Sequence, residues 1–153
     1  MAADFQAGSL EGSSVGQLYN QLISFWNKRD AESFAKLFSE QCNVTGFDGS
    51  QMNGVNEIHE TLSDIFANHK TPPFTTKIRE IRKLDEKVMI LRAAAGMKPD
   101  GNDELDPSLN AIQTMIAIRI NGVWKITLFQ NTPARFDMDP KKRDELTREL
   151  QEK

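Results

Sequence analysis

The 153-residue sequence has one cysteine, Cys42, two histidines and one tyrosine. A single cysteine excludes an internal disulfide and any metal site built from several cysteines. The two histidines lie ten residues apart without a metal-ligand motif. The sequence also lacks a glycine-rich phosphate loop after a strand and a Ser-His-Asp order. We therefore expect no metal and no other cofactor.

An excess of positive charge is absent as well. Nineteen Lys and Arg stand against 22 Asp and Glu, giving a net charge of −3, and this disfavours a nucleic-acid partner. The apolar runs are only a few residues long, well below the ~20 residues needed to cross a bilayer, so no membrane partner is expected. Residues 1–16 lack the pattern of a signal peptide. These absences predict a cytoplasmic protein.

The length fits one domain. Residues 1–13 are rich in glycine and serine and predict a flexible arm. Residues 14–135 hold the periodic apolar patterns and predict one α+β domain. Residues 136–153 form a charged tail in which Pro140 suits a first helical position. The tail predicts a helix that is either frayed or docked on a partner.

Helical spacing of apolar residues alternates with strand-like runs along the domain. Asp30 is a candidate N-cap for a short second helix whose apolar face extends to Phe38. The other expected helices cover residues 14–28 and 55–69. The expected strands cover residues 42–47, 51–54, 74–84, 88–97, 109–120 and 123–131.

The last two strands are joined by Asn121-Gly122, the preferred pair for a type I′ turn. The resulting register places five residues on one face: Gln113, Met115, Trp124, Leu128 and Gln130. The middle of this face is apolar, and the two glutamines face each other at its far end. That combination is typical of a small-molecule pocket, with Trp26 and Phe38 as further wall residues. The run Ala93-Ala94-Ala95-Gly96 either adds volume to this pocket or lets the sheet bend.

The opposite face of this hairpin is apolar too. It carries Ile112, Ile116, Ile118 and Phe129. An antiparallel sheet with one solvated side should alternate apolar and polar residues, so both faces must be covered. Three helices can cover one face. A second subunit in an isologous homodimer is expected on the other, and coverage by the C-terminal tail is the alternative.

Three ionisable side chains are candidates for chemistry. His59 borders the apolar stripe of the third helix and is either a general base or a hydrogen-bonded core histidine. Asp48 lies in a predicted hairpin turn and is either a catalytic carboxylate or a turn former. Arg92 interrupts an apolar strand and either pairs with a buried carboxylate or anchors an anionic ligand group.

Several segments together resemble a known family. They are residues 26–38, 45–49, 58–66, 110–114 and 124–133, the last reading WKITLFQNTP. Their order resembles the SgcJ/EcaC family of the SnoaL-like, nuclear transport factor 2-like superfamily. The resemblance covers roughly residues 14–135. It implies an α+β fold, also called cystatin-like, in which a cone-shaped, curved antiparallel sheet carries three helices on its concave face. It also implies a homodimer through the sheet.

Two functions remain open at this point. One is a cofactor-independent protein that holds a hydrophobic small molecule in the cone, as an isomerase- or cyclase-like enzyme acting on polyketide-like compounds. The other is a non-catalytic dimeric module that binds a ligand or a partner protein. The resemblance to ketosteroid isomerases implies a carboxylate base opposite a tyrosine and a protonated aspartate. Only Tyr19 is available here, with no carboxylate assigned opposite it, so we do not assign that mechanism.

Overall fold

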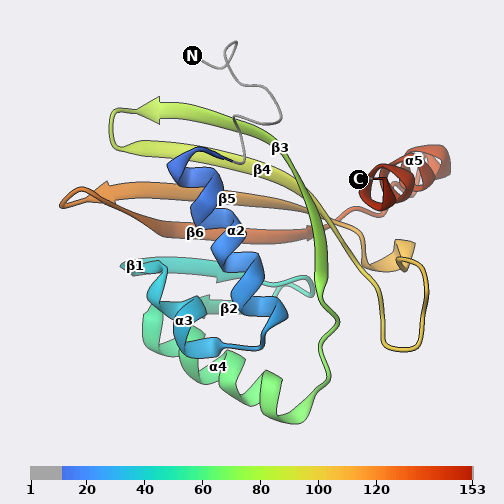
Figure 1. Cartoon of the computed structure of the whole chain (residues 1–153), viewed down its shortest axis with the longest axis horizontal. Coiled ribbons are helices and arrows are strands. Elements are labelled where there is room, and N and C mark those ends of the chain that lie inside the picture. Colours follow the sequence, from blue (N-terminus) through green and yellow to red (C-terminus); the bar gives the residue numbers. More distant parts are fainter. Residues whose placement is uncertain (1–11, 153) are drawn as a thin grey trace.

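Six strands form one mixed sheet in the computed structural model, which describes residues 12–152. The strands are β1 (Phe38–Thr45), β2 (Gln51–Asn53), β3 (Phe74–Asp85), β4 (Val88–Met97), β5 (Ala111–Ile120) and β6 (Val123–Pro133). Their order across the sheet is β2-β1-β6-β5-β4-β3. The expectation of an all-antiparallel sheet is wrong at one place, because β1 and β6 run parallel. The chain crosses to the β3 edge and returns strand by strand, so β6 arrives beside β1 in the same direction (Figure 1).

Four α-helices lie within the described residues, together with a short 3-10 turn. They are α2 (Ser14–Asn27), α3 (Ala31–Lys36), α4 (Val55–Asn68) and α5 (Pro140–Gln151), and the turn is η2 (Pro107–Leu109). The Asp30 carboxylate accepts a hydrogen bond from the Ser33 amide at 3.0 Å and caps α3 as expected. Helix α3 ends earlier than its apolar pattern suggests, so Phe38 lies in β1 rather than on a helix.

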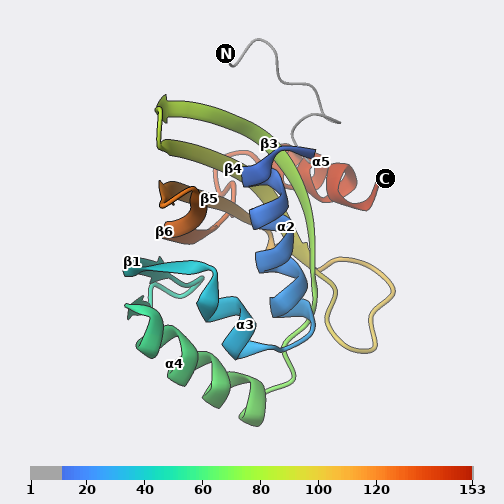
Figure 2. The same cartoon turned by 60° about the vertical axis from the view of Figure 1, so that its left-hand side comes forward.

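Helices α2, α3 and α4 lie on one face of the sheet, which we call the inner face (Figures 1 and 2). Apolar side chains of these helices pack against alternate residues of the central strands. The largest fully buried apolar side chains include Leu22, Ile58, Leu62, Ile81, Leu91, Met115 and Ile126. The three predicted helices therefore form one apolar core with the sheet.

The fourth helix, α5, packs on the opposite, outer face. Leu146 and Leu150 are buried there against Ala94, Leu105 and Ala134. The fold thus has four helices rather than the three expected for the domain, and the tail helix, expected to be frayed or docked on a partner, docks on its own sheet. The sequence left two candidates for covering the second apolar face, a second subunit and the C-terminal tail. Helix α5 of the tail covers the part of this face that includes Ile112.

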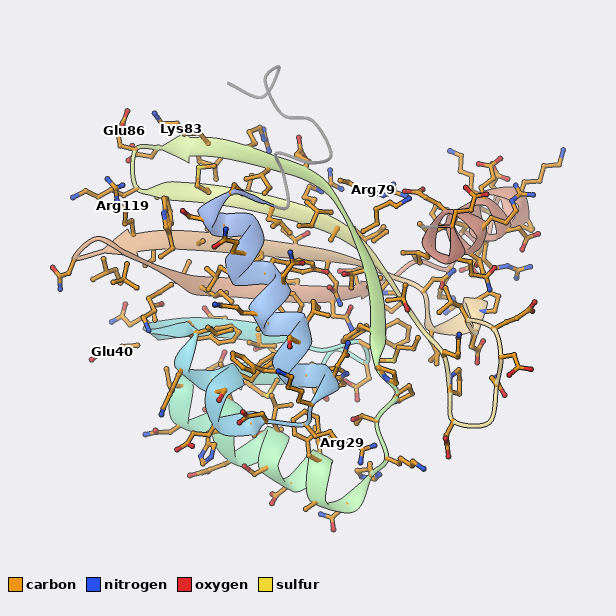
Figure 3. The ribbon with its side chains drawn as sticks, viewed as in Figure 1. Arg29, Glu40, Arg79, Lys83, Glu86 and Arg119 are labelled. Carbon is orange, nitrogen blue, oxygen red and sulfur yellow. The ribbon has the colours of Figure 1, made fainter. Side chains whose placement is uncertain are left out.

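An ion pair joins α5 to the sheet edge. The Arg79 guanidinium on β3 lies 2.8 Å from the Glu149 carboxylate, and the Arg79 side chain extends toward α5 in Figure 3. Both side chains are well exposed, so the pair adds little stability and mainly orients the helix. Apolar burial of the two leucines therefore holds α5 in place.

The β5–β6 hairpin keeps the predicted register only near its turn. Ile120 pairs with Val123, and Arg119 pairs with Trp124, as expected from Asn121-Gly122. A bulge follows, because Ile116 pairs with Leu128 while the next residue, Ala117, pairs with Ile126. Beyond the bulge the faces of β6 are exchanged. The predicted register is wrong in that half, so Leu128 and Gln130 leave the inner face and Phe129 enters it.

No helix among residues 12–152 is long and apolar enough to span a membrane. The flexible arm expected over residues 1–13 falls almost entirely outside the described residues. Ser13 is described, and its hydroxyl caps α2 by accepting a hydrogen bond from the Gly16 amide at 2.9 Å.

Candidate functional site

A cavity of about 320 Å³ lies on the inner face, between α2, α4 and the β1–β2 hairpin. Its walls are mostly apolar and come from elements far apart in the sequence. Leu22 of α2, Leu62 of α4, Val44 of β1 and Phe129 of β6 are examples. These side chains face one another across the space between the helices and the sheet. The result is a partly open, largely apolar space that the core does not fill.

Trp26 forms one wall of the cavity and is held in place on three sides. Its indole nitrogen donates a hydrogen bond to the Pro72 carbonyl at 3.2 Å. Its ring centroid lies 5.3 Å from those of Phe66, in an edge-to-face arrangement, and of Phe74. Phe74 also lines the cavity. This aromatic group gives the cavity a rigid surface, and it places Trp26 where the sequence predicted a wall residue.

Asp48 lies at the exposed rim of the cavity, in the turn between β1 and β2. Its carboxylate accepts a hydrogen bond from the Ser50 amide at 2.9 Å, the contact of a turn former. This bond lowers the pKa of Asp48 below its ordinary value of 3.8. Gly49 completes the turn with a φ of +92°. Among residues 12–152, Asp48 is the only ionisable residue that lines the cavity, and it stays negatively charged at neutral pH.

A buried chain of polar side chains runs from α2 to the cavity wall. The Tyr19 hydroxyl donates a hydrogen bond to Oε1 of Gln113. The Gln113 amide nitrogen donates to Oδ1 of Asn131 at 3.1 Å, and Asn131 lines the cavity. Tyr19 and Gln113 are fully buried, and burial raises the pKa of Tyr19 well above its ordinary value, although the neighbouring Thr76 hydroxyl partly offsets the rise. The tyrosine is therefore a neutral donor over the whole physiological range.

The bulge explains why Asn131, and not Gln130 as predicted, is hydrogen-bonded to Gln113. Gln113 pairs in register with Asn131, whereas Gln130 pairs with Thr114 and is exposed on the outer face. The predicted mouth between Gln113 and Gln130 is thus wrong. Leu128 lies on the outer face for the same reason.

The other predicted wall residues lie outside the cavity. Met115 is fully buried in the core, and Phe38 packs on Phe34, with ring centroids 5.6 Å apart. Trp124 lies near the hairpin turn, where the Arg119 guanidinium is 5.8 Å from its ring centroid. The structure therefore brings only Trp26 and Asp48 of the predicted residues to the cavity, with Gln113 one hydrogen bond behind it.

His59 and Arg92 face solvent instead. His59 is exposed on α4 and does not line the cavity. Arg92 is exposed on the outer face, and its guanidinium lies 3.8 Å from the Glu80 carboxylate on β3. The carboxylate that Arg92 pairs with is thus a surface residue. Neither side chain lines the cavity.

Sequence reasoning missed Tyr19 and Asn131 as parts of a site. Tyr19 has apolar neighbours at helical spacing, which marks a core position but does not reveal its partner. Asn131 could have been found from the adjacent pair Leu128-Phe129, which breaks the alternation of β6 and is a signal for a bulge. Among residues 12–152, no group of three or more His, Cys, Asp or Glu side chains could hold a metal ion.

These features define an α+β domain with an apolar cavity between its sheet and helices, and comparison with known families agrees with this class. The SnoaL-like domain family matches residues 15–130. The chain belongs to that family. None of the curated proteins compared shows a significant match to the sequence.

Solved structures share the fold at low sequence identity. A domain of unknown function with a cystatin-like fold from Nostoc punctiforme has 20% identity and a TM-score of 0.78, covering 90% of this chain and 85% of its own. A nuclear transport factor 2-like protein of unknown function from Shewanella oneidensis has 19% identity and a TM-score of 0.60, with coverages of 78% and 96%. A ketosteroid isomerase-like protein from Erwinia carotovora has 12% identity and a TM-score of 0.65, with coverages of 81% and 96%. At these identities the likeness concerns the fold.

Proposed function

We propose that the protein binds an apolar small molecule in the cavity between the sheet and helices α2 and α4. The observation that carries this proposal is the cavity of about 320 Å³ with apolar walls. Small-molecule sites are typically enclosed, apolar spaces of roughly 300–1,000 Å³ with a few placed polar groups. The fixed ring of Trp26 and the amide of Asn131 supply these two kinds of contact.

Binding alone explains the site better than acid–base catalysis. A general base has to reach the proton it removes and needs a pKa near the working pH. Asp48 is the one ionisable residue that lines the cavity in the described part of the chain. It is exposed at the rim, and its hydrogen bond with the Ser50 amide lowers its pKa. A carboxylate of this kind is a weak base. We therefore favour a ligand-binding module over an enzyme.

An isomerase- or cyclase-like enzyme of the SgcJ/EcaC family, acting on polyketide-like compounds, is the second candidate. The sequence resemblance supports it, and Asp48 at the cavity rim is the residue that would act as its base. The test is turnover of a polyketide-like compound by the wild type and by Asp48→Asn. Loss of turnover in the variant at unchanged substrate binding would favour the enzyme, and absence of turnover in the wild type would leave the binding module.

The second proposal concerns a homodimer through the outer face. Ile90, Ile116, Ile118 and Leu128 are only half-buried there, and α5 packs on a different part of the face. Ile112 and Phe129 do not belong to this surface, since Ile112 packs with the α5 cluster and Phe129 lies in the inner core. A contiguous apolar surface of this kind is typical of an interface.

The protein's single, buried cysteine favours a reducing compartment, and we propose the cytoplasm.

Sedimentation velocity tests the dimer. Ile116→Asp places a charge in the middle of the surface and should convert a dimer into a monomer, because an unpaired carboxylate is costly to bury. Ser63→Asp, at an exposed position on α4 and away from the outer face, adds the same single negative charge and is the control for charge alone. A wild type that sediments as a monomer at micromolar concentration would refute the dimer.

Quenching of tryptophan fluorescence tests the cavity. Trp124→Phe leaves Trp26, which lines the cavity, as the only tryptophan, and Trp26→Phe leaves Trp124, which does not. Saturable quenching by 1-bromonaphthalene is expected for the Trp26 protein and not for the Trp124 protein. Thr61→Phe fills the cavity from α4 and should weaken the quenching while the far-ultraviolet spectrum stays unchanged. Equal quenching of both tryptophans would contradict a ligand site in this cavity.

A further inference from the structure

The direction of the buried hydrogen-bond chain determines which polar group the cavity presents. The Tyr19 hydroxyl has one proton, and it donates that proton to Oε1 of Gln113. The amide nitrogen of Gln113 is therefore at the other end of the side chain, where it donates to Oδ1 of Asn131. Because Tyr19 is buried and neutral, a change in pH within the physiological range does not alter this order.

Asn131 is the last member of the chain and the only one that lines the cavity. Its amide oxygen is taken by Gln113, so its amide nitrogen is the free end of the side chain. Within residues 12–152, that nitrogen has no hydrogen-bond acceptor. The amide nitrogen carries two N–H donors, and because it is not among the atoms shut off from solvent, a ligand that enters the cavity can reach it. An apolar ligand that displaces water from this nitrogen must itself supply a hydrogen-bond acceptor, or the donors lose their partners.

The remaining polar side chains around the cavity do not determine whether a ligand must donate or accept a hydrogen bond. Hydroxyls such as those of Thr61 and Ser50 rotate, and each can donate or accept. Asp48 and Gln51 belong to the exposed hairpin at the rim. Asn131 alone has its hydrogen-bonding direction set by a buried network.

We infer that Asn131 recognises its ligand as a hydrogen-bond donor, and that the ligand is an apolar molecule carrying a carbonyl oxygen. This inference rests on the proposed binding function and deepens it by naming the ligand's chemical class. The apolar body fills the space beside Trp26, Leu22 and Leu62, and the carbonyl accepts a hydrogen bond from Asn131. Gln113 and Tyr19 are positioning residues, because they act on the ligand through Asn131.

A matched pair of probes tests the inference by isothermal titration calorimetry. The ketone 2-acetylnaphthalene and the hydrocarbon 2-isopropenylnaphthalene have nearly the same shape, and only the ketone has a carbonyl oxygen. A neutral hydrogen bond of ordinary strength predicts roughly three- to tenfold tighter binding of the ketone to the wild type. The ratio of the two dissociation constants is the readout, so a general change in stability affects both probes and cancels.

Two variants separate the role of the Asn131 donor from that of the residues that position it. Asn131→Asp keeps the oxygen that accepts from Gln113 and replaces the amide nitrogen with an acceptor oxygen, so the hydrocarbon should become the better ligand. Tyr19→Phe removes the hydroxyl that orients Gln113 and should lower the ketone preference while hydrocarbon binding is retained. Retained preference in Asn131→Asp would overturn the inference.

The two levels of the proposal fail differently. Equal binding of ketone and hydrocarbon to the wild type would overturn the role of Asn131 and leave the apolar binding site intact. Failure of both probes to bind would overturn the binding function, and with it the inference.

Discussion

The two faces of the sheet bury apolar side chains in different ways. On the inner face, large residues such as Leu22, Leu62 and Trp26 surround a cavity of about 320 Å³. On the outer face, α5 lies directly on Ala94 and Gly96, and a Cβ added to Gly96 would be 3.1 Å from Cδ1 of Leu150. Small residues let a helix approach the sheet closely, whereas bulky ones hold it away. Small sheet residues thus let α5 fill its part of the outer face, whereas on the inner face large side chains from helices and strands surround the space that keeps room for a ligand.

The run Ala93-Ala94-Ala95-Gly96 illustrates the difference within one strand. Alternate residues of β4 point to opposite faces. Ala93 and Ala95 are fully buried on the inner face without lining the cavity, and Ala94 and Gly96 lie under α5. The two sequence-based explanations were cavity volume and sheet bending. The structure adds a third, which is space for a helix on the outer face.

The largest effect is expected for Leu62→Ala on the inner face. Leu62 is 1% exposed, and its truncation should cost about 2–5 kcal/mol of unfolding free energy, because the enlarged cavity loses packing contacts. Urea unfolding followed by circular dichroism measures this loss. A cost below about 1 kcal/mol would show that α4 closes onto the sheet, and that large residues do not hold the cavity open.

Leu150→Ala on the outer face should cost less, about 1–3 kcal/mol. Leu150 is 2% exposed, but it belongs to a small apolar cluster separate from the main core, so α5 can detach locally, and this limits the loss to the docking energy of the helix. Hydrogen exchange should show faster exchange confined to α5. Faster exchange throughout α2 and α4 would instead mean that the two faces unfold as one unit.

Gly96→Ala tests the close approach directly. The new methyl group would meet Leu150 at 3.1 Å and Leu105 at 3.2 Å, so we expect a loss of about 1–2 kcal/mol. The double variant with Leu150→Ala relieves the tighter contact and should lose less than the sum of the single variants. Additive losses would indicate that Gly96 is not under strain from α5.

The smallest effect is expected for Asp48→Asn at the cavity rim. The Ser50 amide lowers the pKa of Asp48, so ionised Asp48 stabilises the fold above its ordinary pKa. That contribution is lost as the pH falls through the lower, folded-state pKa. The stability difference between wild type and variant should therefore shrink below about pH 4. A carboxyl titration by NMR with a midpoint above 3.8 would contradict the assignment.

Local signals in the sequence predicted most elements, and non-local contacts determined the rest. Asn121-Gly122 correctly indicates the hairpin and its first pairs. The bulge in β6 also involves β1: the Thr127 hydroxyl donates a hydrogen bond to the Gln41 carbonyl, and the β1–β6 register shifts at the same level. This hydrogen bond joins residues 86 positions apart in the sequence. Beyond the bulge, Gln130 lies outside the site and Asn131 lies in it. No turn signal carries that information.

The docking of α5 has the same explanation. Pro140 and the two leucines of α5 predict a helix with an apolar side. The surface that receives it depends on Ala94 and Gly96, more than 40 residues earlier. Sequence reasoning could therefore predict the helix and leave open whether it docks on its own chain or on a partner.

Two indole N–H signals in the NMR spectrum give the most direct test of the central claim. The protein has two tryptophans, of which Trp26 lines the cavity and Trp124 lies near the β5–β6 turn. Addition of 2-isopropenylnaphthalene should shift the Trp26 signal in a saturable way and leave the Trp124 signal in place. A shift confined to Trp124, or no saturable shift at either indole, would contradict an apolar ligand site on the inner face.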